Sequence, residues 1–438
     1  MTTIKLKKGY DLKLKGNVED LNVVKAKQPQ FFAVVPDDFT GIVPRLEKKE
    51  GDIVAAGEAL YHDKSHEAIK VCSPVSGTVK EVRRGERRKI EAIIIEADGK
   101  QTSAQIPTDD VKAALLQSGL WAMMRQRPYD IVPNPDIVPR DIFVTCFDSA
   151  PLAPSLAIFT QNKQEFIAKG IAALSALTSG KVYLGCSPDN VIESDNTVVF
   201  QGPHPAGNAG IQAANIKPVN KGEVIWTTDI VTVIRLGQLL ASGNVDYTTI
   251  VAVTGENATK PQLVQCTMGA PISSIVSGNI ADAANTRIIS GNVLTGTPVD
   301  ADSYLRAPYR QITAIPNISR PDEFMGWASV SPKKFSIYRS FTSWLLGGNK
   351  PKSFDAKING GERAIVMAGE YDRMIPMDIY AEFLIKAIIT FDIEKMEQLG
   401  IYEVAPEDFA LAEYADTSKL ELQRIVREGL NRLYAEMC

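Results

Sequence analysis

The middle of the chain alternates short apolar runs rich in β-branched residues with segments whose apolar residues recur at helical spacing. IFVTCF, KVYLGC and TTIVAVTG predict strands, whereas KQEFIAKGIAALSAL and DIVTVIRLGQLLASG predict helices. Asp229 is expected to cap the second of these helices and Gly243 to end it. Strands that alternate with helices of about 12 residues pair in parallel through right-handed crossovers. The sequence therefore predicts an α/β domain, which we place at residues 101–255.

The first hundred residues favour β structure instead. FFAVVP, GIVPRL, GTVKEV and IEAIIIEA are short strand candidates separated by Gly, Pro and charged turns. EGDIVAAGEAL and SPVSGTVKEV resemble the two halves of a lipoyl or biotinyl carrier domain, a flattened barrel of two small sheets. This resemblance implies a barrel-sandwich hybrid domain at residues 1–100. The alternating polar and apolar residues of MTTIKLKKGYDLKLKG predict a strand pair at its start.

A carrier domain needs an exposed lysine at the tip of the hairpin between its two halves. Lys64 lies near that tip, whereas Lys70 stands in the biotin-like sequence EAIKV, close to the returning strand. The segment 64–74 is longer than the tight hairpin of a carrier. We therefore expect an unmodified domain, with a modified lysine as the alternative.

The same hairpin contains the HxxxH spacing of a zinc-binding helix, at His62 and His66. On strands, however, four residues span about 13 Å, so the two rings cannot bind one ion. We expect no metal site. The five cysteines include no CxxC pair, so iron–sulfur clusters and structural zinc are not expected, and the internal thiols should be buried. They are Cys72, Cys146, Cys186, Cys266 and Cys438.

The turn RRGERRK at residues 83–89 gathers five positive charges around one glycine. Two interpretations stay open for it. The turn is a solvated hairpin, or it docks the chain on an acidic partner or on anionic lipid headgroups. The candidate docking residues are Arg83, Arg84, Arg87 and Arg88.

After residue 256 the sequence changes character twice. KPQLVQCTMGAPISSIVSG and TRIISGNVLTGTP are β runs around a short amphipathic segment, which predicts a small β-grasp unit at 256–330. Residues 331–438 are predicted to be helical, with Thr417 as the N-cap of the last helix. The loop GEYDRMIP carries a pair of acidic residues beside an arginine, but no nucleophile accompanies them. We interpret them as ion pairs and predict no catalytic residue.

The loop GPHPAGNAG at 202–210 has the glycine content of a nucleotide-binding loop. As a Walker A loop it fails, because Asn208 and Ala209 stand where Lys and Ser or Thr are needed. As a dinucleotide fingerprint it fails because Pro205 stands at the first glycine position. Pro218 follows so soon that any helix after the loop is short, which weakens an anion site at its N-terminus. The loop is expected to be a structural turn or a site that has lost its nucleotide.

Charge and hydropathy exclude two classes of partner contact. The formal net charge of −4 argues against a nucleic-acid partner. No apolar run approaches the roughly 18 residues of a membrane span, since Lys386 and Arg235 interrupt the longest ones. The N-terminus lacks the apolar segment of a signal peptide, so a cytoplasmic location is expected.

Several long phrases together carry a family resemblance over almost the whole chain. SPVSGTVKEVRRG, GPHPAGNAG, RIISGNVLTGT, FMGWASVSPKKFSIYRSF and GEYDRMIPMDI, in this order, resemble the NqrA subunit of the sodium-translocating NADH:quinone oxidoreductase. The resemblance implies an α/β multidomain protein: barrel-sandwich hybrid, Rossmann-like domain, β-grasp domain of the soluble-ligand-binding (SLBB) type, and helical C-terminal domain. It also implies similarity to the flavin-carrying, NADH-oxidising subunit of respiratory complex I.

The same resemblance implies a peripheral subunit on the cytoplasmic side of the bacterial inner membrane. It would carry no cofactor of its own and would belong to a six-subunit complex that reduces quinone and exports Na⁺. The glycine loop then resembles the remnant of a flavin site. ALAEYADTSK at 410–419 lies where a cluster segment would be expected, but it offers Ala412 and Asp416 in place of cysteines.

Three functions follow from these observations. The first is a quinone-binding subunit, whose site needs an apolar cleft and a hydrogen-bond donor for the quinone carbonyl. The residues that we select for it are His204, Gly207, Phe39 and Phe147. The second is a scaffold without a ligand. The third, a free NADH dehydrogenase, is disfavoured by the altered glycine loop.

Overall fold

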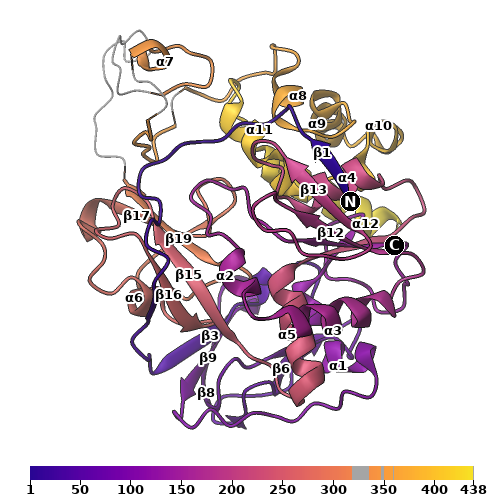
Figure 1. The fold of residues 1–438 in the computed structure, drawn as a ribbon, viewed down its shortest axis with the longest axis vertical. Coiled ribbons are helices and arrows are strands. Elements are labelled where there is room, and N and C mark those ends of the chain that lie inside the picture. Colours follow the sequence, from indigo (N-terminus) through magenta and orange to yellow (C-terminus); the bar gives the residue numbers. More distant parts are fainter. Residues whose placement is uncertain (318–334, 347–349, 359, 438) are drawn as a thin grey trace.

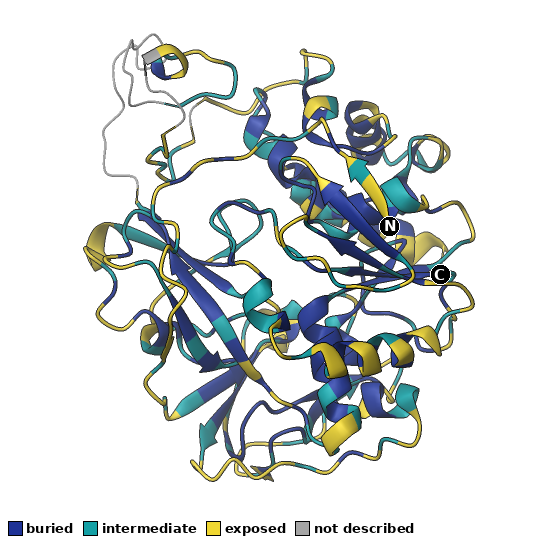
Figure 2. Ribbon diagram, viewed as in Figure 1, coloured by how far each residue is buried: buried dark blue, intermediate teal, exposed yellow. Residues whose placement is uncertain are grey.

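The computed structural model describes residues 1–317, 335–346, 350–358 and 360–437 (Figure 1). In these residues the strands form two small sheets and two sheets of six strands. Buried residues follow the strands of the large sheets and the inner faces of the helices, while the outer helix faces are exposed (Figure 2). The expected α/β multidomain architecture is confirmed.

The two small sheets form the barrel-sandwich unit. One has the order β3 (Phe31–Val34), β9 (Ile90–Ala97), β8 (Gly77–Arg84), β5 (Ile53–Val54), and the other β4 (Pro44–Leu46), β6 (Ala59–Asp63), β7 (Lys70–Cys72). The phrase SPVSGTVKEV supplies β8, which pairs antiparallel with β9. Short 3-10 turns occur at Pro36–Asp38 (η1) and Glu86–Arg88 (η2).

The first 25 residues do not pair with either small sheet. β1 (Thr2–Lys5) lies parallel to a strand of the α/β sheet, and β2 (Val23–Lys25) lies parallel to a strand of the other large sheet. The expected strand pair at the N-terminus is therefore wrong. The reason is that both large sheets offer an open edge to which one short strand can hydrogen-bond.

The α/β sheet has the order β1, β13 (Thr197–Gln201), β12 (Val182–Cys186), β11 (Ile142–Thr145), β14 (Ile225–Asp229), β10 (Arg125–Arg127). All neighbours are parallel except β10, which runs antiparallel beside β14. β11 to β14 thus have the order 3-2-1-4 of a Rossmann-like half, with the strand order reversing between β11 and β14.

Helices cover both faces of this sheet. They are α1 (Val111–Gln117), α2 (Ala157–Thr160), α3 (Gln164–Ser175), α4 (Ala209–Ile216) and α5 (Ile230–Ser242), with a 3-10 turn at Trp121–Met123 (η3). Ile142 and Val144 of β11 share a core with α3 and α5, and Phe143 shares the other core with α4. The alternation along β11 therefore divides the interior into two apolar cores, one on each face.

The helix caps show where sequence signals decide the ends. The Asp229 carboxylate accepts the N–H of Thr232 at 2.9 Å, and Gly243 ends α5 at φ 73°, so both predictions are confirmed. Thr417 is not an N-cap, because α12 (Leu422–Met437) begins five residues later. The Asp416 carboxylate instead accepts the N–H groups of the following residues and holds them in a turn.

The third unit is built on the second large sheet. Its order is β18 (Thr297–Val299), β17 (Thr286–Ser290), β19 (Gln311–Pro316), β15 (Thr248–Thr254), β16 (Gln262–Thr267), β2, with α6 (Ile272–Ile275) and the turn Ala283–Asn285 (η4) beside it. The sequence assigned β15 to the α/β sheet, and this assignment is wrong. β10 already occupies the edge of β14, so β15 pairs with β16 and β19.

The remaining helices pack on the face of the α/β sheet that carries α4 (Figure 1). They are α7 (Ser343–Leu346), α8 (Glu370–Met374), α9 (Ala381–Thr390), α10 (Ile393–Gln398), α11 (Ala410–Ala415) and α12, with turns at Ile401–Glu403 (η6) and Pro406–Phe409 (η7). Part of FMGWASVSPKKFSIYRSF and the expected boundary near residue 330 lie outside the described residues. No helix of the described ranges is both long and apolar enough to cross a bilayer.

Candidate functional site

The glycine loop lies at the carboxyl edge of the parallel sheet, between β13 and α4. Ligands of open α/β sheets bind at this edge, because the loops that follow the strands diverge there. The segment after β11, residues 146–150, reaches the same place, and Thr145 connects the two. Its hydroxyl lies 2.8 Å from the carbonyl oxygen of Gly207 and 3.0 Å from that of Phe147.

Gly207 is required by space. A Cβ added there would lie 2.6 Å from the backbone nitrogen and 2.9 Å from the Oγ of Ser149. Its φ is not among the positive ones of the chain, so the positive φ considered for this turn is not the reason for glycine. The close approach lets the Gly207 N–H donate to Oγ of Ser149 at 2.8 Å.

His204 is buried in this loop, with 3% of its surface exposed. Its backbone N–H donates to the Asp11 carboxylate at 2.8 Å, and its carbonyl accepts the N–H of Tyr10 at 2.9 Å. The N-terminal segment therefore crosses the loop and closes it on one side. Nδ1 of the ring lies 3.0 Å from Oγ of Ser149, while Nε2 is buried without a hydrogen-bond partner.

The imidazole of His204 is neutral at physiological pH. Burial lowers its pKa to about 4, against a smaller opposing effect of the Ser149 backbone. Because Oγ of Ser149 already accepts the Gly207 N–H, we assign its own proton to the hydrogen bond with Nδ1. This assignment places the ring proton on Nε2. The loop thus presents a neutral N–H donor.

The two candidate phenylalanines have different positions. Phe147 packs against the core that also contains α4 and the C-terminal helices, and its carbonyl is held beside Gly207 through Thr145. Phe39 is buried in the core on the other face of the sheet, next to the barrel-sandwich unit. The structure therefore brings Phe147 to the glycine loop and does not bring Phe39 there.

The first turn of α4 is occupied by an arginine. A Cβ at Gly210 would lie 2.2 Å from a terminal nitrogen of Arg127, so the guanidinium presses against the helix. Arg127 is 1% exposed and donates to the Asp408 carboxylate and to the Glu403 carbonyl, each at 2.8 Å. These contacts join the loop region to the C-terminal helices.

Glu407 lies beside the same turn. Asn208 donates to its carbonyl at 3.4 Å, and its carboxylate lies 3.5 Å from Arg127. Nearly half of the side chain is exposed, yet surrounding protein and the neighbouring Asp408 raise its pKa to about 8. Glu407 therefore lies in a recess that solvent reaches, and it holds a proton at neutral pH.

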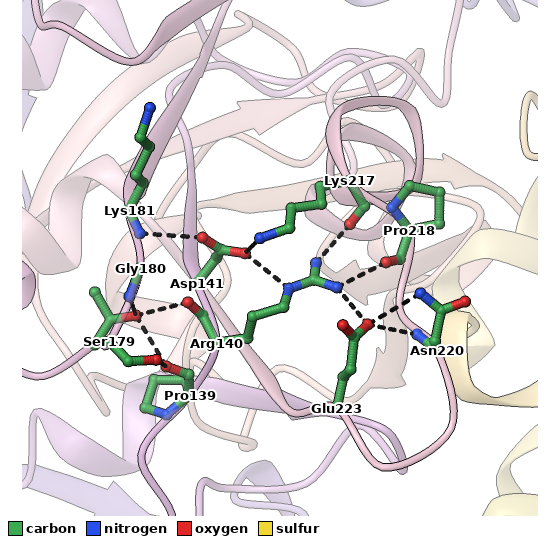
Figure 3. A network of polar contacts seen from close by, with 11 residues as sticks. Pro139, Arg140, Asp141, Ser179, Gly180, Lys181, Lys217, Pro218, Asn220 and Glu223 are labelled. Carbon is green, nitrogen blue, oxygen red and sulfur yellow. Dashed lines mark hydrogen bonds and ion pairs between the residues drawn. The ribbon is translucent and has the colours of Figure 1, made fainter.

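The opposite edge of the sheet is fixed by an ion network (Figure 3). The buried Asp141 carboxylate accepts from Arg140 and from Lys217, each at 2.8 Å, and from the N–H of Lys181 at 3.0 Å. Burial alone would raise the pKa of Asp141, but these hydrogen bonds lower it below its ordinary value. Arg140 also binds the carbonyls of Lys217 and Pro218, so the network anchors the segment that follows α4.

The basic turn stands far along the barrel-sandwich unit, on the hairpin of β8 and β9. Arg83, Arg84, Arg87 and Arg88 are all exposed. Arg83 pairs with Glu81 at 3.1 Å and Arg84 donates to the Arg88 carbonyl at 3.1 Å. The turn thus offers several cations to a partner.

The other candidate residues lie apart from the glycine loop. Lys64 is exposed at the β6–β7 hairpin, whereas Lys70 pairs with Glu47. His62 lies 2.7 Å from Glu47, and His66 lies 3.4 Å from Asp63. In the described part of the chain no group of three or more His, Cys, Asp or Glu could hold a metal ion.

The internal cysteines are buried free thiols, as expected, and Cys438 lies outside the described residues. In α11 and the turn after it, Ala412 and Asp416 are buried. An open depression of about 410 Å³ lies between the end of α5 and the start of β15. None of His204, Gly207, Phe39 and Phe147 lines it.

Sequence reasoning missed Ser149, Asp11 and Arg127. Ser149 follows the strand IFVT and therefore reaches the carboxyl edge of the sheet, which is a usable signal. Asp11 lies nearly two hundred residues before His204, and no local pattern connects them.

Comparison with known proteins gives matches along most of the chain. Family models described as NqrA N-terminal barrel-sandwich hybrid domain, NqrA second alpha/beta domain and NQRA C-terminal domain match residues 4–98, 106–245 and 250–301. Proteins named as the NqrA-type subunit of Na(+)-translocating NADH-quinone reductase are similar over 99% of this chain and 100% of their own length. The one from Neisseria meningitidis serogroup A is 32% identical, and that from Saccharophagus degradans is 33% identical.

A solved structure of the NAD+-reducing [NiFe]-hydrogenase in the H2-reduced state is 12% identical, with a TM-score of 0.37. It covers 75% of this chain and 62% of its own. A likeness at this TM-score supports no conclusion about this chain.

Proposed function

Because the chain belongs to the NqrA family of Na(+)-translocating NADH-quinone reductase subunits, we propose that it binds the quinone of that complex at the glycine loop. In this proposal the chain is a peripheral subunit on the cytoplasmic side of the bacterial inner membrane. It is one of six subunits, contacts a membrane-embedded one, and carries no redox cofactor of its own. Quinone reduction is coupled to Na⁺ export.

The observation that supports this proposal best is the unpartnered Nε2 of His204. A quinone carbonyl accepts hydrogen bonds, and a neutral imidazole N–H in an apolar surrounding is a suitable donor. Phe147 on one side adds apolar surface. Glu407, protonated at neutral pH, lies on the same edge of the sheet.

In the reaction, the quinone takes up two electrons and two protons and becomes the quinol. The electrons arrive from other subunits of the complex. The part of this chain is to orient one carbonyl through His204. Glu407 is placed to return a proton from solvent to the recess.

The alternative is a scaffold subunit without a ligand, and two observations favour it. Arg127 fills the space against Gly210 where a phosphate would lie in a nucleotide-binding relative. Nε2 of His204 is also closed off from solvent, so a quinone reaches it only if the loop moves. A scaffold needs no such movement.

Titration of a short-chain quinone into the purified chain distinguishes the two. Wild type should bind, and His204→Ala should weaken binding by one hydrogen bond, about 1 kcal/mol or roughly five-fold. His66→Ala, which removes a histidine of the distant hairpin, is the matched control and should bind like wild type. Absence of quinone binding to wild type would leave the scaffold as the function.

The proposal about cofactors has its own test. The purified chain should be colourless, without flavin or iron, and its mass should match the sequence. A flavin absorption band that survives gel filtration, or added mass on Lys64 or Lys70, would contradict it.

A further inference from the structure

A small cavity lies where the α/β domain meets the sheet of the third unit, apart from the glycine loop. Its wall includes Arg235 of α5, Thr249 of β15, and Arg306 and Arg310 of the segment before β19. Its volume of about 10 Å³ holds about one water-sized particle. The wall contains three arginines and no acidic residue.

Two of the three guanidinium groups have carboxylate partners outside the wall. Arg306 pairs with Asp38, a residue of the barrel-sandwich unit. Arg310 pairs with Asp229 at the carboxyl end of β14, at 3.1 Å. These two positive charges are compensated.

Arg235 differs from both. It is 6% exposed, and among the described residues no carboxylate lies within ion-pair distance of it. Its guanidinium donates to the carbonyl of Thr248 at 3.1 Å. Burial lowers the pKa of Arg235 and the neighbouring Arg310 lowers it further, while Asp229 and Asp246 oppose this only in part. Because an arginine stays protonated in proteins, a buried positive charge without a direct acid partner faces the cavity.

A buried charge without a paired counter-charge is costly, and an anion at this place removes that cost. The size of the cavity selects among anions. A phosphate, a sulfate or the carboxylate of an organic ligand exceeds a space that holds one water-sized particle. We propose that the cavity bounded by Arg235, Arg306 and Arg310 binds a single monatomic anion of the chloride type.

The position of this site gives the anion a structural consequence. α5 belongs to the α/β domain, whereas Thr249 and the segment 305–310 belong to the third unit. Arg306 reaches Asp38 of the barrel-sandwich unit. A bound halide would therefore strengthen a junction of three parts of the chain.

Bromide is the direct probe, because it scatters X-rays anomalously near an accessible absorption edge. Crystals of the full chain soaked in bromide should give an anomalous peak in contact with the Arg235 guanidinium. This measurement uses wild type alone, so it does not depend on the folding of a variant. A cavity without an anomalous peak under saturating bromide would overturn the proposal.

Thermal melts provide the second test. At equal ionic strength, chloride should raise the melting temperature of wild type by a few degrees over gluconate, because a ligand that binds only the folded state stabilises it. Arg235→Gln should lose this difference. Arg45→Gln, which removes an exposed arginine of the barrel-sandwich unit, should keep it. Equal melting temperatures of wild type in the two salts would contradict the proposal.

Discussion

Oγ of Ser149 lies 3.0 Å from Nδ1 of His204 while it accepts the N–H of Gly207 at 2.8 Å. This relay fixes the tautomer of the imidazole, because the serine proton is directed at Nδ1. We expect nitrogen NMR of the labelled chain to show a neutral His204 with its proton on Nε2 at pH 7. Ser149→Ala should remove the preference and leave a mixture of tautomers. A proton on Nδ1 in wild type would contradict the assignment.

The low pKa of His204 predicts a dependence of stability on pH. Burial places the folded pKa near 4, below the ordinary 6.5, so between these values the unfolded chain binds a proton that the folded chain does not. The stability contributed by neutral His204 is fully present above pH 6.5 and is lost as pH falls toward 4. At pH 5 the loss is about 2 kcal/mol, since each pKa unit corresponds to about 1.4 kcal/mol.

The comparison that isolates this effect is between wild type and His204→Gln, which does not titrate. From pH 7 to pH 5 the melting temperature of wild type should fall by more than that of the variant. Other groups, such as Asp141, affect both proteins equally, because the lowered pKa of that carboxyl is unchanged by the substitution. Parallel melting curves for the two proteins would show that His204 does not titrate in this way.

Local signals in the sequence decided much of the fold, and pairing between distant segments decided the rest. The ends of α5 follow from Asp229 and Gly243, because a cap and a left-handed glycine act within one turn of the helix. β15 is a correctly predicted strand in the wrong sheet. Its apolar run specifies a buried strand, but only the position of β10 beside β14 excludes it from the α/β sheet.

The candidate site was partly accessible for the same reason. Gly207 and His204 stand in one glycine loop, and that composition is visible along the sequence. Asp11 and Arg127 reach the loop from other strands and could not be predicted, since their contacts depend on how β1 and β10 join the sheet. Phe39 is apolar and conspicuous, but the sheet separates it from His204.

Gly207→Ala should destabilise the chain without any effect on backbone strain. The added methyl group would lie 2.6 Å from the Ser149 nitrogen, and overpacking of this kind costs about 1–3 kcal/mol. Gly361→Ala is the matched control, because nothing lies within 4 Å of its added Cβ, and it should stay within about 0.5 kcal/mol of wild type. Chemical denaturation measures both. Equal stabilities of the two variants would mean that the loop yields to the methyl group.

The basic turn is tested by charge reversal. If it docks the chain on an acidic partner or on anionic headgroups, changing Arg83, Arg84, Arg87 and Arg88 to Glu should release the chain from membranes that contain the complex. The melting temperature should change by only a few degrees, because exposed charges contribute within about 0.5 kcal/mol each. Sedimentation of membranes followed by detection of the chain measures the release.

A control with the same change in net charge separates docking from general electrostatics. Reversal of four exposed lysines elsewhere, Lys27, Lys100, Lys181 and Lys260, should leave the chain on the membrane. Release by both sets would indicate that only the net charge of the chain matters, since long-range attraction depends on the summed charge. Retention of the arginine variant would identify the turn as a solvated hairpin, in which Arg83 and Arg84 serve only their contacts with Glu81 and Arg88.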